Sequence, residues 1–183
     1  MKTRCFFLFL MIIVLDSCTS TKNTGGTRWY HSFNTRYNVY FNGQQAYEAA
    51  VKAQLEGYTE NYSEMIYMHP VSSLPKEKEK AGGSFDKSIE KAVKAIKMHS
   101  IQTKPERNQG KQRDPKYREF LNRKEFNPFL HNAWMLMGQS QFFNGDFIEA
   151  ASSFAYISRL YESQPEIAIP AQLWKARCYA EMG

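Results

Sequence analysis

The sequence predicts an all-α fold built from antiparallel helical hairpins. Aromatic residues recur at offsets of three and four over residues 28–41, and apolar residues do the same over residues 85–99. Such offsets place side chains on one face of a helix. In addition, one phrase occurs twice, as YFNGQQAYEAA at residues 40–50 and as FFNGDFIEAA at residues 142–151. The Asn-Gly pair in each copy is typical of a turn, which predicts two hairpins of related design.

Residues 1–17 are predicted to be a lipoprotein signal peptide. A basic start (MKTR) precedes an apolar run at residues 5–15, which is too short to cross a bilayer. The LDSC segment that follows resembles a bacterial lipobox, which predicts that Cys18 carries lipid. Asp16 departs from that pattern, and an ordinary secretory signal is the alternative. Residues 18–27 are expected to form the lipid anchor and a polar, Gly-rich tether.

The cysteines and the charge exclude some classes of protein. Cys5 is expected to leave with the signal peptide and Cys18 to take the lipid, so no internal disulfide framework is predicted. Cys178, the third cysteine, is predicted to be a buried helix residue. The formal net charge is +6. Nucleic acid is not expected as a partner of an exported protein, whereas acidic proteins, anionic lipid and cell-wall material are left open.

Residues 28–102 are predicted to form a degenerate N-terminal helical region. The aromatic stripe over residues 28–41 is expected to end in a left-handed turn at Gly43, with a second helix at residues 44–56. A further helix is expected at residues 85–99, with its lysines facing solvent. Its predicted buried face consists of Ile89, Ala92, Val93 and Ile96.

Residues 103–126 are predicted to form a basic loop and a short helix. The loop covers residues 103–113, where no apolar periodicity occurs. Asp114 and Pro115 are typical of an N-cap and a first helical position, so the short helix is expected to begin there. The lysines and arginines of this segment favour a solvated loop, and a groove for acidic partners is the alternative.

Residues 127–183 have spacings typical of tetratricopeptide (TPR) repeats. Gly138 and Ala150 are expected where two helices cross, because large side chains do not fit there, and Gly145 is expected at the turn. The surrounding aromatic positions are Trp134, Phe147 and Phe154. The start of the next unit is matched by Ala176, Tyr179 and Gly183. The last repeat is therefore expected to be truncated, and the chain to be the front piece of a longer protein or a truncated gene product.

The combination of these features resembles one family. Four segments carry the resemblance: YNVYFNG, IEKAVKAIKMHSI, FNPFLHNAWMLMGQSQFFNGDFIEAASSFAYISRLY and LWKARCYAEMG. In these segments the chain is similar to the PorW/SprE family of TPR lipoproteins. That family occurs in Bacteroidetes that use type IX secretion, some of which glide. The resemblance covers nearly all of the mature chain and maps the lipidated cysteine onto Cys18. It implies a periplasmic adaptor, anchored in the outer membrane, that connects the outer-membrane translocon with the trans-envelope motor and its ring.

Protein binding is the predicted function, with no catalytic, cofactor or metal site. The four histidines are scattered and lack metal-ligand spacing. Helical repeats commonly bind partners in a groove, here expected to be lined by Asn132, Gln139 and Gln141. The expected partners are other type IX secretion subunits and, through the lipid, the membrane, with no small-molecule substrate. No acidic residue directly follows Cys18, which favours the periplasmic face of the outer membrane. The alternative is a surface lipoprotein that binds glycans beside a nutrient transporter.

Overall fold

The described part of the chain is all-helical. The computed structural model describes residues 22–63, 66, 68–69, 71 and 84–183, and no strand occurs among them, which confirms that the fold is all-α. The signal peptide and Cys18 lie outside the described residues. The helices are α2 (Gly25–Asn34), the π-helical segment η1 (Thr35–Tyr40), α3 (Phe41–Gly57), α4 (Asp86–His99), the 3₁₀ segment η3 (Gln109–Lys111), α5 (Pro115–Asn122), α6 (Leu130–Phe143), α7 (Phe147–Leu160) and α8 (Pro165–Met182).

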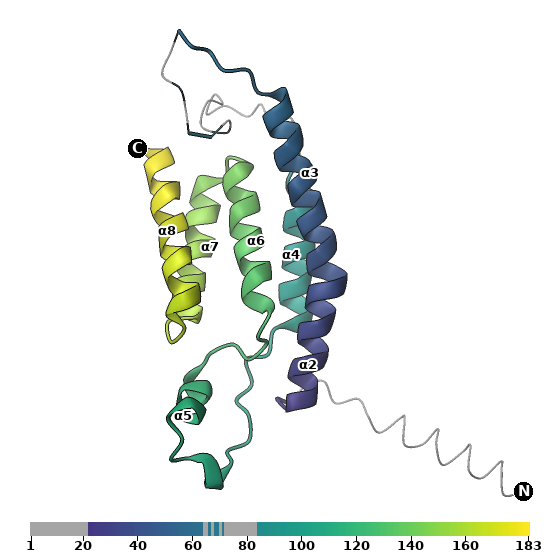
Figure 1. Ribbon diagram of the computed structural model, residues 1–183, viewed down its shortest axis with the longest axis vertical. Helices are drawn as coiled ribbons and strands as arrows, with labels where there is room; N and C mark the ends of the chain where they lie inside the picture. The colour runs from purple at the N-terminus through teal and green to yellow at the C-terminus, as the bar shows by residue number, and fades with distance from the viewer. Residues whose placement is uncertain (1–21, 64–65, 67, 70, 72–83) are drawn as a thin grey trace, which may run out of the picture.

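The helices form two staggered layers with a small lobe at one end: α3, α6 and α8 lie side by side, and α4 and α7 lie behind them (Figure 1). α2, η1 and α3 follow one another without interruption and make a single long rod. α4 packs along this rod, α6 packs against α4, α7 against α6, and α8 against α7. The lobe that carries α5 lies at the end where α2 begins (Figure 1). α6 is therefore covered on two sides, by α4 and by α7.

The prediction of a turn at Gly43 is wrong. Gly43 lies inside α3 and is buried, and the positive φ angles in the described chain belong to Gly145 and Gly183 instead. A Cβ added at Gly43 would lie 3.1 Å from Cδ2 of Leu136 and 3.2 Å from Cβ of Lys91. The glycine therefore permits a close approach of α3 to α4 and α6, a role that does not require a left-handed backbone.

The first helix begins earlier than the sequence predicts. α2 starts at Gly25, whereas the sequence predicts a tether up to Thr27 and a helix from Arg28 onward. Thr24 accounts for this, because its Oγ1 accepts a hydrogen bond from the Thr27 N–H at 3.2 Å and caps the helix. Asn23 is also buried, and its Nδ2 donates to the Thr103 carbonyl at 2.6 Å. Residues 23–27 are thus part of the folded domain.

Other helices follow the sequence prediction closely. α4 covers Asp86–His99, with Ala92 fully buried and the other predicted apolar positions partly buried against α6. α5 begins at Pro115, and Oδ1 of Asp114 accepts a hydrogen bond from the Lys116 N–H at 2.9 Å. Cys178 is free and fully buried, and burial raises the pKa of its thiol to about 11. This thiol is a packing group and not a nucleophile at neutral pH.

Candidate functional site

The turn between α6 and α7 is closed by a glycine-dependent hydrogen-bond pattern. Gly145 has a φ of 86°, and its N–H donates to the Phe142 carbonyl at 3.0 Å. The Asp146 N–H donates to the Gln141 carbonyl at 2.9 Å. This pair of bonds is the Schellman motif, which requires a left-handed residue after the helix. Asp146 precedes α7 as expected, but its Oδ2 accepts from Asn144 Nδ2 at 2.6 Å and makes no hydrogen bond to the helix.

The two helices of this hairpin meet at Gly138. A Cβ added at Gly138 would lie 2.7 Å from Cε1 and from Cζ of Phe154, a distance that real contacts do not allow. Phe154 is fully buried, and its ring stacks on Trp174 of α8 with centroids 5.7 Å apart. Ala150 is also fully buried, and Phe147 contacts the buried ring of Phe142. Gly138, Ala150, Phe147 and Phe154 therefore belong to one packed cluster that links α6, α7 and α8.

Trp134 lies one helical turn before Gly138 on α6 and also packs against this cluster. Its ring contacts Tyr156 of α7 with centroids 4.8 Å apart, and it packs on buried residues of α4 and α6. The positions predicted for the next repeat unit are arranged differently. Ala176 and Tyr179 on α8 are exposed, Tyr179 by 55%, and Gly183 has a φ of 92° at the end of that helix.

α8 presents an apolar outer surface. Its inner side, with Ile167, Ala171 and Cys178, is buried against α7. On its outer side Ile169 is 62% exposed and Leu173 is 57% exposed. Residues four apart lie next to each other on a helix, so these two side chains form an apolar row open to solvent.

The three residues expected to line a groove along α6, Asn132, Gln139 and Gln141, are all partly buried. Oε1 of Gln141 accepts a hydrogen bond from Ser153 Oγ at 2.7 Å, so this side chain holds α7 in place. Asn132 donates to the Phe129 carbonyl at 3.2 Å. Gln139 is partly buried on the same helix. Of the three, Gln141 therefore connects α6 to α7, and Asn132 bonds to the residue that precedes α6.

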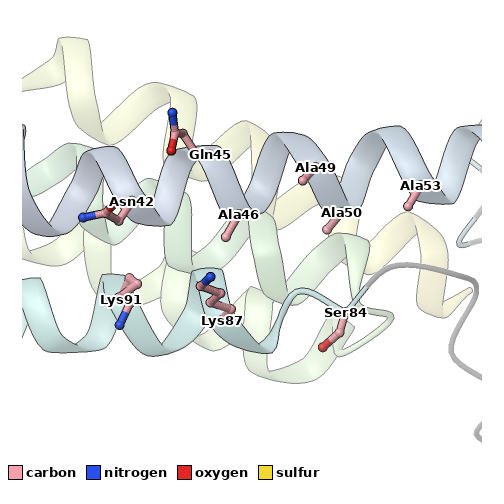
Figure 2. A pocket seen from close by; sticks show the side chains of 9 residues that line it. All are labelled: Asn42, Gln45, Ala46, Ala49, Ala50, Ala53, Ser84, Lys87 and Lys91. Atoms are coloured by element: carbon pink, nitrogen blue, oxygen red, sulfur yellow. The ribbon is translucent and has the colours of Figure 1, made fainter.

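A shallow groove does occur between α3 and α4 (Figure 2). It has a volume of about 740 Å³, and its floor is a row of alanines on α3. Lys87 and Lys91 extend along its α4 side, and Asn42 and Gln45 lie on α3 (Figure 2). The small alanine side chains leave this space open.

The aromatic residues that predict the first helix lie on its outer face. Trp29 is 67% exposed, and its ring stacks on Phe33 at 5.5 Å, which in turn contacts Tyr37 at 4.9 Å. Tyr30 and Phe41 are exposed as well. The apolar periodicity thus marks a surface, whereas the inner face of the same rod carries polar side chains.

Those polar side chains form a buried junction between the rod, α4 and residues 125–127. Asn127 Nδ2 donates to Thr35 Oγ1 at 3.1 Å and to the His99 carbonyl at 2.9 Å. Oε1 of Glu125 accepts from the N–H groups of Ile101 and Asn127, both at 2.8 Å. Oδ1 of Asn127 also accepts from the Phe129 N–H at 3.1 Å, just before α6 begins at Leu130.

Two histidines contact each other within this junction. His31 Nδ1 and His99 Nδ1 are 3.0 Å apart, so one ring donates a hydrogen bond to the other. Burial, and secondarily the neighbouring His31 ring, lower the pKa of His99 below its usual 6.5. Burial also lowers the pKa of His131.

These shifts predict a loss of stability in mild acid. The unfolded chain takes up protons below about pH 6.5 that the folded chain resists, so the free energy of unfolding falls as the pH drops through that value. Urea midpoints at about pH 7.5 and about pH 5.5 measure the loss. A His99→Asn variant should show a smaller difference between the two pH values, and an unchanged difference would contradict this assignment.

The described residues hold no grouping of three or more histidine, cysteine or acidic side chains suited to a metal ion. Among the same residues, no helix is both long enough and apolar enough to span a bilayer. Four surface features stand out in the described part of the chain: the outer side of α8, the groove on α3 and α4, the aromatic face of α2, and the basic lobe around α5. No protein-family model matches the chain, and no curated protein matches it either.

Proposed function

We propose that this protein is a non-catalytic adaptor that binds other proteins through TPR-like helical hairpins. The observation that carries this proposal is the cluster at Gly138 and Phe154, in which a glycine on α6 receives an aromatic ring from α7 and that ring stacks on α8. In TPR repeats small residues at such crossings let helical hairpins stack side by side. The exposed row of Ile169 and Leu173 on α8 offers the next helix or partner an apolar surface.

The resemblance to the PorW/SprE family supplies the context. We infer a lipoprotein anchored through Cys18 at the periplasmic face of the outer membrane, where it connects subunits of the type IX secretion system. The lipobox-like LDSC and the missing acidic residues after it support this location. The adaptor needs no cofactor, because its task is to hold partners at fixed positions.

A complementation experiment tests this proposal. Deleting the gene in the source bacterium should abolish secretion of type IX cargo, and the wild-type gene should restore it. The Cys18→Ala variant should restore it poorly and leave the membrane fraction. A double variant, Ile169→Glu with Leu173→Glu, should also fail. Its matched control is Leu55→Glu with Ile148→Glu, which introduces the same charges at residues of similar exposure on α3 and α7.

Normal secretion in the deletion strain would refute the adaptor role. A glycan-binding surface lipoprotein is the second candidate, and the exposed rings of Trp29 and Tyr37 favour it, because aromatic faces stack on sugars. Protease treatment of intact cells distinguishes the two. Digestion of the protein from outside would support the glycan-binding candidate, and full protection supports the periplasmic one.

A further inference from the structure

The α5 lobe, which we define as residues 103–124, concentrates positive charge. It contains eight lysines and arginines and three acidic residues. Two of the acidic side chains have internal roles, since Asp114 caps α5 and Glu119 pairs with Arg123 at 3.8 Å. Lys104 donates to the carbonyls of Leu121 and Arg123. Five other cations of the lobe are exposed and make no salt bridge and no side-chain hydrogen bond within the described residues: Arg107, Lys111, Arg113, Lys116 and Arg118.

The lobe is fastened to the beginning of α2. Asn23 Nδ2 donates to the Thr103 carbonyl at 2.6 Å, and the Arg28 guanidinium lies over the Phe120 ring at 5.0 Å. Arg28 also donates to Asn23 Oδ1 at 2.6 Å, so one small cluster joins both elements. Figure 1 shows the lobe and the first turn of α2 at the same end of the molecule.

The first turns of α2 add aromatic and cationic groups at this end. Trp29 and Tyr30 are 67% and 55% exposed. The sequence has no acidic residue between Asp16 and Glu48, while Lys22, Arg28 and Arg36 fall in that interval. Tryptophan and tyrosine beside lysine and arginine are the side chains enriched at the interface between lipid and water.

The covalent chain keeps this end close to any lipid on Cys18. Gly25 follows Cys18 by seven residues. Seven residues span at most about 25 Å even when fully extended. A folded end so near a bilayer experiences the surface potential of anionic headgroups, which extends about 8 Å at physiological salt and attracts each nearby lysine or arginine.

We propose that the α5 lobe and the first turns of α2 form a docking surface for an anionic lipid bilayer. The exposed cations of the lobe bind headgroup phosphates, and Trp29 and Tyr30 enter the interfacial region. This inference rests on the proposed lipid anchor for the source of the bilayer. Contact between the lobe and the bilayer would fix the orientation of the adaptor relative to the membrane.

Vesicle co-sedimentation with protein that carries no lipid tests the docking surface. The protein used is the mature chain with Cys18→Ala, and circular dichroism verifies that each variant is folded. Vesicles of phosphatidylcholine mixed with an equal part of phosphatidylglycerol should bind it. Pure phosphatidylcholine vesicles should bind it at least about tenfold more weakly, and raising the salt from about 0.05 to about 0.5 M should remove most of the binding.

Two charge-matched variants locate the surface. Replacing Lys111, Arg113 and Lys116 by glutamine should weaken binding about tenfold or more, because each nearby cation contributes to the attraction. Replacing Lys87, Lys94 and Lys97 of α4 by glutamine removes the same charge from another exposed face and should leave binding unchanged. In addition, the tryptophan emission of the unsubstituted chain should shift to shorter wavelength on binding, and Trp29→Phe should lose that shift.

Three outcomes would overturn the proposal: no vesicle binding, equal binding to neutral and anionic vesicles, or equal weakening by both charge variants. The first of these would point to an acidic protein or cell-wall polymer as the ligand of the lobe. Because the assay uses unlipidated protein and measures no secretion, its failure is distinct from failure of the adaptor role.

Discussion

Replacing Glu125 by alanine is expected to lower the free energy of unfolding by about 3 to 5 kcal/mol, since each buried N–H left without an acceptor costs about 1–3 kcal/mol. Glu125 is 2% exposed. Its Oε1 accepts from the N–H groups of Ile101, Phe126 and Asn127, and its Oε2 accepts from Ser100 Oγ at 2.5 Å. The carboxyl group thereby fixes the end of α4 to the start of α6. Urea denaturation followed by circular dichroism measures the change.

Two further variants separate this role from a general effect of charge removal. Glu125→Gln keeps one acceptor oxygen and should cost less than the alanine variant. Glu119→Ala removes an exposed carboxylate of α5, whose salt bridge to Arg123 is weak, and should change stability by less than about 1 kcal/mol. If Glu125→Ala and Glu119→Ala lowered the free energy of unfolding equally, the hydrogen bonds of Glu125 would contribute nothing to stability.

The second large effect is expected at the crossing of α6 and α7. Phe154→Ala should lower the free energy of unfolding by about 3 to 5 kcal/mol, because it empties a fully buried site that also supports Trp174. Gly138→Ala should lower it by about 1–3 kcal/mol, because the new Cβ would lie 2.7 Å from two ring atoms of Phe154.

A double-mutant cycle makes the crossing argument specific. With Phe154 replaced by alanine, the ring that opposes a Cβ at Gly138 is gone. The second substitution, Gly138→Ala, should then be neutral or should stabilise the protein by up to about 1 kcal/mol, since alanine favours a helix more than glycine does. If the two substitutions changed the free energy of unfolding additively, the Phe154 ring would not be the reason that position 138 needs a glycine.

Local signals in the sequence predict much of this fold. The capping pair at Asp114 and the apolar spacing of residues 85–99 predict α5 and α4, and the structure agrees. The glycines at 43 and 145 show the limit of such signals. Both follow Phe-Asn, yet Gly145 has a positive φ and Gly43 is helical. What distinguishes them is a tertiary contact, the approach of Leu136 and Lys91 to Gly43, which no local pattern encodes.

The surfaces were harder to predict than the helices. The aromatic periodicity of residues 28–41 correctly indicates a helix, but it does not tell which side of the helix is buried. The side that packs on α4 carries His31 and Thr35, whose polar groups are satisfied by His99 and Asn127. Those partners lie 68 and 92 residues away along the chain. A polar inner face of this kind depends on distant hydrogen bonds, so composition alone would assign it to solvent.

The uninterrupted rod of α2, η1 and α3 has a mechanical consequence. It covers residues 25–57, and a helix of that length extends about 50 Å at about 1.5 Å per residue. α4 lies alongside this rod, so tension applied between the N-terminus and the C-terminal helices would load their contact in shear. Contacts loaded in shear resist together, whereas contacts that are peeled apart fail one after another. The contact between the rod and α4 is thus oriented to resist a pulling force applied at the N-terminal end.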